Sequence, residues 1–103
     1  MANNKELIGK IIEKKPDQVR NKKSSHYGTN FWRLAVEIEN EEIKEILVFE
    51  CWLENKEKWL TMEQLEMKDF LDKKYLFEVQ RKPGAGQVYR LINWELLQDY
   101  GSN

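Results

Sequence analysis

The chain has 103 residues, of which 41% are hydrophobic and 34% are charged, and its formal net charge at pH 7 is −1. This length allows one domain with a single core, over residues 1–103 with an ordered part of about 6–97, and the composition excludes a disordered chain. No apolar run is long enough to span a membrane and the first residues lack a secretory signal, so we expect a cytoplasmic protein with no membrane partner.

The N-terminal half is expected to contain three strands, over residues 6–14, 31–39 and 43–53. Gly9 within the first strand indicates a bulge or a sharp bend, and Pro16 is expected to end it. The polar turn at 40–42 predicts an antiparallel hairpin between the second and third strands.

Clean alternation divides the second strand into two faces. The apolar face is expected to point into the core, and it carries Trp32, Leu34, Val36 and Ile38. Phe31 and Arg33 fall on the opposite face. The third strand is nearly continuous in apolar residues, which makes a homodimer or a higher homo-oligomer plausible.

The C-terminal half begins with a change of period. A helix is expected over residues 55–67, followed by strands over 73–82 and 87–97 that are joined by a turn at 83–86. Trp59 on the helix and Trp94 on the last strand are expected to be core residues. The tail from residue 98 is expected to be frayed.

This order of elements predicts the fold class: mainly β, a five-stranded antiparallel OB-fold barrel with one helix between the third and fourth strands. A bent first strand suits a barrel because that strand must serve both halves of a curled sheet. An open five-stranded α+β sheet is the alternative.

Charge is distributed unevenly along the chain. Residues 10–33 hold seven cations and two acids, a net charge of +5, whereas residues 34–72 hold twelve acids and four lysines, a net charge of −8. The positive part coincides with the long connection between the first two strands, residues 15–30. A positive segment on a near-neutral protein can attract a phosphate backbone, although a charge run is more often a solvated face.

Four segments resemble the single-strand-binding protein family and its relatives, the primosomal OB-fold proteins. They are "ELIGKIIEKKPDQVR", "FWRLAVEI", "EILVFECWLEN" and "KKYLFEVQRKPGAGQVYRLINWEL". The chain is also similar to small single-strand-binding-like proteins of cyanobacteria and plastids, and a plastid origin would place it in the stroma. The resemblance covers most of the chain and implies an OB-fold that binds single-stranded DNA, or RNA, in DNA replication.

Single strands are bound by cations that follow the phosphates and by aromatic rings that stack on the bases. In an OB-fold the usual surface crosses the second and third strands, between the first loop and the loop that joins the last two strands. The candidate nucleic-acid-binding residues are therefore Lys15, Arg20, Lys22, Lys23, Tyr27, Phe31, Arg33, Trp52, Arg81 and Lys82.

Each of these candidates also has a structural interpretation. Phe31 and Tyr27 could close the end of the barrel, and the side on which Trp52 lies cannot be assigned. Arg33 could stack or bind phosphate, or it could pair across strands with a glutamate such as Glu50.

No enzyme chemistry, metal or cofactor is expected. His26 is the only histidine and Cys51 the only cysteine, too few for a zinc site, and Cys51 is expected to be a buried inert thiol in a reducing compartment. The alternative function is a protein–protein adaptor or structural subunit without nucleic-acid binding, and the acidic middle third favours it.

Overall fold

The long first strand organises the fold. In the computed structural model, which describes residues 4–39, 42–81 and 88–99, β1 runs from Asn4 to Gln18. It pairs with β4 (Lys73–Arg81) through residues 4–9 and with β2 (Asn30–Ile38) through residues 9–18. Gly9 lies where the strand changes partners, and a Cβ atom there would come within 2.3 Å of the Glu37 carbonyl oxygen. This change of partners at Gly9 is what a first strand shared by both halves of a barrel requires, and the register shift of the strand lies between Ile11 and Glu13.

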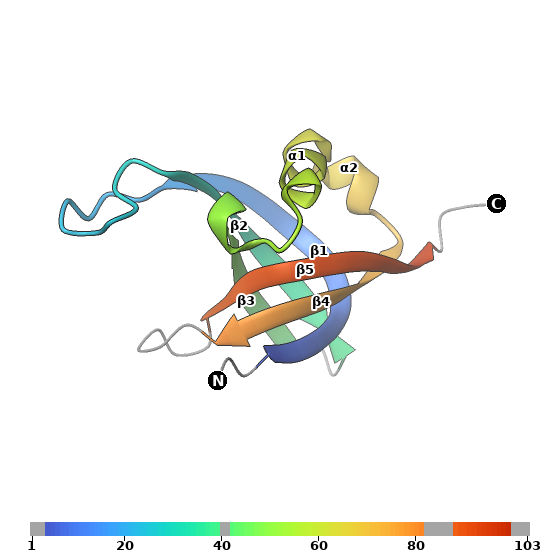
Figure 1. The fold of residues 1–103 in the computed structure, drawn as a ribbon. Helices are drawn as coiled ribbons and strands as arrows, with labels where there is room; N and C mark the ends of the chain where they lie inside the picture. The colour runs from blue at the N-terminus through green and yellow to red at the C-terminus, as the bar shows by residue number, and fades with distance from the viewer. Residues whose placement is uncertain (1–3, 40–41, 82–87, 100–103) are drawn as a thin grey trace.

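The remaining strands close a barrel in the order β1-β2-β3-β5-β4 (Figure 1). β3 (Glu42–Val48) pairs antiparallel with β2, and β5 (Val88–Asp99) pairs antiparallel with β4. β3 and β5 are parallel. The OB-fold-like barrel is therefore confirmed over the open sheet, but the expectation that all strands are antiparallel is wrong. A closed ring with an odd number of strands must contain at least one parallel pair.

Two helices and a 3₁₀ turn fill the connection between β3 and β4, where one helix was expected. They are η2 (Glu50–Trp52), α1 (Lys56–Gln64) and α2 (Met67–Phe70). The Asn55 side chain caps α1 by accepting from the Glu57 backbone N–H. At the other end, the Lys14 ammonium donates to the carbonyl oxygens of Met62 and Leu65 and satisfies them where α1 stops. Within the described residues, no helix combines the length and apolarity needed to cross a membrane.

The main core fills the barrel. Leu34 and Val36 from the predicted inner face of β2 are buried there, and Trp32 and Ile38 pack against it in part. Trp59 and Trp94 are buried in the same core, as expected.

Several boundaries differ from the prediction. β1 continues through Pro16 to Gln18. Pro16 does not interrupt pairing on both sides, because β4 pairs with β1 only as far as Gly9 and the rest of β1 pairs with β2. The edge beyond Gly9 has no partner strand among the described residues, and proline is tolerated in a strand that has such an edge. β3 ends at Val48 rather than residue 53, and β5 extends to Asp99. The turn at 83–86, most of the turn at 40–42 and the last four residues lie outside the described residues.

Candidate nucleic-acid interface

Residues 19–29, here called the arm, connect β1 to β2 and project away from the barrel (Figure 1). The backbone hydrogen-bonds across the base of the arm: the Val19 N–H donates to the Thr29 carbonyl at 3.0 Å and the Gly28 N–H to the Val19 carbonyl at 3.0 Å. Gly28 has a φ of 83°, a left-handed conformation that glycine adopts readily. The arm is shorter than the predicted loop over 15–30 because both flanking strands run further.

The arm carries three cations and no acid. Lys22 and Lys23 are exposed, and neither side chain has an ion-pair partner among the described residues. The Arg20 side chain is 82% exposed and lies 3.5 Å from Asp17. Tyr27 is 55% exposed, so its ring is accessible as the stacking prediction requires. Four of the predicted residues are thus brought together on one projecting segment.

A second buried cluster lies at the base of the arm. This arm-base cluster consists of Phe31, Leu47 and Phe49, with Val19, Trp52 and Val88 packed against it. Phe31 is only 6% exposed and stacks on Phe49 at 4.4 Å between ring centroids. The expectation that Phe31 offers an exposed ring to a base is therefore corrected: the outer face of β2 is covered here by residues that follow β3.

Trp52 was expected on the strand over residues 43–53, but it lies on η2. Its ring is half-buried, with the Phe49 ring centroid at 4.0 Å and the Arg90 Cζ at 4.6 Å from its own centroid. Arg33 lies similarly over Phe31, with Cζ 5.3 Å from the ring centroid. The cluster therefore carries two guanidinium groups, and a guanidinium plane can itself stack on a base or bind phosphate.

Carboxylates already hold the Arg33 guanidinium. Its Nε donates to Asp17 and its Nη1 donates to Glu45. The expected cross-strand pair with a glutamate therefore forms, but the glutamate is Glu45 and not Glu50. The hydrogen bond from Arg33, followed by that from the Gln18 N–H, lowers the pKa of Asp17. The same bond to Asp17 raises the pKa of Arg33. A phosphate at Arg33 must compete with these two acids.

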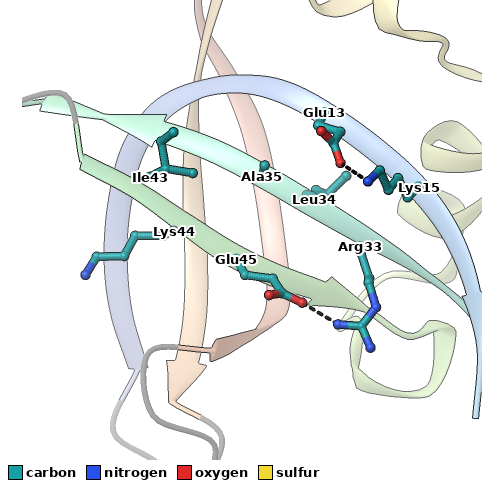
Figure 2. Close-up of a pocket in the computed structure, with 8 residues that line it drawn as sticks. All are labelled: Glu13, Lys15, Arg33, Leu34, Ala35, Ile43, Lys44 and Glu45. Carbon is teal, nitrogen blue, oxygen red and sulfur yellow. Dashed lines mark hydrogen bonds and ion pairs between the residues drawn. The ribbon is translucent and has the colours of Figure 1, made fainter.

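The outer face of β1, β2 and β3 forms a pocket of about 470 Å³ (Figure 2). Its cations are all paired. Lys15 lies 2.8 Å from Glu13, which raises the pKa of Lys15, and Lys44 lies 2.6 Å from Glu42. Figure 2 shows the Glu13–Lys15 and Arg33–Glu45 pairs lying along the pocket. The centre of the strand 2–3 face is therefore a surface of paired charges and is not a positive groove.

The predicted second loop contributes less than expected. Arg81 is exposed at the end of β4, opposite Tyr89, and Figure 1 shows that end of β4 well separated from the arm. Lys82 lies outside the described residues. Cys51 is exposed on η2, which corrects the expectation of a buried thiol. Over the part of the chain that the structure describes, no three His, Cys, Asp or Glu side chains are grouped to hold a metal ion.

Sequence reasoning missed three residues of this site. Asp17 was not predicted as part of the site, because Pro16 was expected to end the first strand. The strand continues instead, and its pairing with β2 places Asp17 opposite Phe31. Strict alternation along the expected strand 87–97 would place Arg90 on the same face as Trp94, but a register shift between Glu78 and Val79 moves it to the other face. Phe49 was taken as one of a continuous apolar run, and nothing in that run distinguishes the residue that covers Phe31.

Comparisons of the chain with protein-family models, with curated proteins and with solved structures found no match.

Proposed function

We propose that this protein is a non-enzymatic OB-fold protein that binds single-stranded nucleic acid, in the first instance single-stranded DNA. The observation that carries the proposal is the arm: three cations without an acid, beside the exposed ring of Tyr27, on a segment that projects from the barrel. The phosphates would follow Arg20, Lys22 and Lys23, and one base would stack on Tyr27.

The strand would continue from the arm onto the arm-base cluster. Arg33 and Arg90 lie there over aromatic rings, with Cζ 5.3 Å and 4.6 Å from the ring centroids, and a guanidinium group can stack on a base or bind phosphate. The paired charges on the centre of the strand 2–3 face favour an interface confined to the arm and its base. This is narrower than the surface expected from the sequence.

The expected affinity is modest and depends on salt. Stacking contributes roughly 1–3 kcal/mol per base. Each phosphate contact with a single strand adds about 0.7 to the steepness with which log K falls against log salt. Three arm contacts and one stacked base give useful binding at low salt, and a homo-oligomer would raise the affinity through avidity.

Fluorescence anisotropy with labelled oligo(dT) and oligo(U) tests the proposal, with a DNA duplex for comparison. We expect saturable binding of at least one single strand that weakens as salt rises, and weaker binding by Arg33→Ala and by Arg90→Ala. Absence of binding to all oligonucleotides at low salt would refute it.

The rival function is a protein–protein adaptor, and one observation favours it. Ile43 is 57% exposed and lines the pocket of Figure 2, whose charges are already paired. A surface with paired charges and an exposed aliphatic side chain suits a protein partner better than a phosphate backbone. If no oligonucleotide binds in the anisotropy experiment, the adaptor is the better explanation of what this protein does.

A further inference from the structure

A second pocket, of about 230 Å³, lies between the base of the arm and α1. The ends of β1 and β2 form one wall with Pro16, Asp17, Asn30, Phe31 and Trp32. Trp59 and Glu63 from α1 form the other. At this volume the pocket is below the usual range for a drug-sized ligand, about 300–1,000 Å³, and suits a single side chain.

The lining combines three aromatic residues with two carboxylates. Aromatic faces attract cations through the quadrupole of the ring, and nearby carboxylates add a direct attraction. The protein already uses Trp32 in this way, because the Lys14 ammonium lies 4.0 Å from its ring centroid. Trp32 is half-buried and Trp59 almost fully buried, so their positions are fixed by the core before any ligand arrives.

The two carboxylates differ in availability. Asp17 is occupied by Arg33, Arg20 and the Gln18 N–H. Glu63 is exposed and makes no hydrogen bond or ion pair with the described residues; its charge only attracts Lys14 from a distance. Glu63 is therefore the group with unused capacity for a cation from outside.

The surrounding helices reinforce this polarity. Residues 54–72 hold six acids and three lysines, a net charge of −3. A negative region of this kind attracts basic segments and repels phosphates. A nucleotide base entering the pocket would bring its own phosphate towards Asp17 and Glu63, so the lining selects against nucleic acid.

We propose that this pocket binds a lysine or arginine side chain presented by a basic peptide segment of a partner protein. The cationic head lies against Trp32 and Trp59 and pairs with Glu63. Phe31 and Asp17 also lie at the base of the arm, but the aromatic and acidic lining of the pocket suits a cation, whereas the cations of the arm suit phosphate.

The test is a ¹⁵N–¹H NMR titration of the indole N–H signals, which are four because the chain has four tryptophans. The probes are an arginine- and lysine-rich peptide, its counterpart with citrulline and norleucine in place of the cations, and thymidine monophosphate. We expect the cationic peptide alone to shift the signals of Trp32 and Trp59. Assignment by single Trp→Phe variants identifies these signals.

Glu63→Gln is expected to weaken the binding of the cationic peptide about two- to fivefold, the range for a partly exposed ion pair. Glu57→Gln is the matched control, since it removes the same charge from the exposed surface of α1 outside this pocket and should change the affinity little. Glu63→Arg should abolish the response, because its own guanidinium competes for the pocket. Equal effects of Glu63→Gln and Glu57→Gln, an equal response to the neutral peptide, or shifts of Trp32 and Trp59 with thymidine monophosphate would each overturn the inference.

Discussion

Removing two cations from the arm gives the sharpest prediction for the proposed function. In Lys22→Ala/Lys23→Ala both side chains are lost from exposed positions where neither has an ion-pair partner among the described residues. The fold should therefore be unaffected, because the double variant breaks no ion pair within the described residues. Any change in binding then reports contacts with the ligand.

The size of the effect follows from counterion release. Each phosphate contact on a single strand contributes about 0.7 to the slope of log K against log salt, so the double variant should lower the slope by about 1.4. If counterion release dominates, the affinity for oligo(dT) falls about 65-fold at roughly 50 mM salt and about tenfold at roughly 200 mM salt. The effect must shrink as salt rises.

Anisotropy titrations across this salt range measure both quantities. Lys56→Ala/Lys68→Ala is the control, because it makes the same change in net charge at two exposed lysines that lie in α1 and α2. We expect the control to stay within about twofold of the unchanged protein, because long-range surface charges are screened by salt. Equal losses in the two double variants, or an unchanged slope in the arm variant, would show that the arm does not contact phosphates.

Three further outcomes follow from the geometry. Glu45→Gln should strengthen oligonucleotide binding about two- to fivefold, because it releases one acid from Arg33, and a weaker complex by anisotropy would argue against a phosphate at that guanidinium. The Asp17 pKa is depressed below its ordinary value of 3.8, so Asp17 stabilises the fold above that pH and loses this contribution as the pH falls through the lowered pKa. Urea unfolding should thus show Asp17→Asn less stable than the unchanged protein at neutral pH, with a difference in stability that shrinks as the pH falls below 3.8; a difference that does not shrink in acid would contradict the ion pair as its cause. Gly9→Ala should lower the free energy of unfolding by about 1–3 kcal/mol, because its Cβ meets the Glu37 carbonyl oxygen, and a variant of unchanged stability would show that β1 and β2 can separate there without cost.

The sequence was sufficient for the order of the strands and the helical connection, because that order depends on local patterns, but it left an open sheet as an alternative to the closed barrel. Alternation in β2 assigned Leu34 and Val36 to the core, and the change of period placed a helix with Trp59 between the third and fourth strands. The parallel pair of β3 and β5 follows from closing five strands into a ring, although the strand patterns themselves do not reveal it. The charges and the exposed ring of the arm were also predictable, since a projecting loop displays what its sequence contains.

The surface beside the arm could not be predicted, because it depends on which residues meet across strands. A strand that continues past Pro16 brings Asp17 to Arg33, and a register shift in β5 turns Arg90 towards Trp52. Phe49 and Trp52 fold back over Phe31 and remove its ring from solvent. By itself the sequence determined the order of the strands, the helical connection and the charge of the arm, since each follows from residues near one another in the chain. Only the tertiary structure decided which cations are held by acids and which rings are covered, because both depend on register between distant segments.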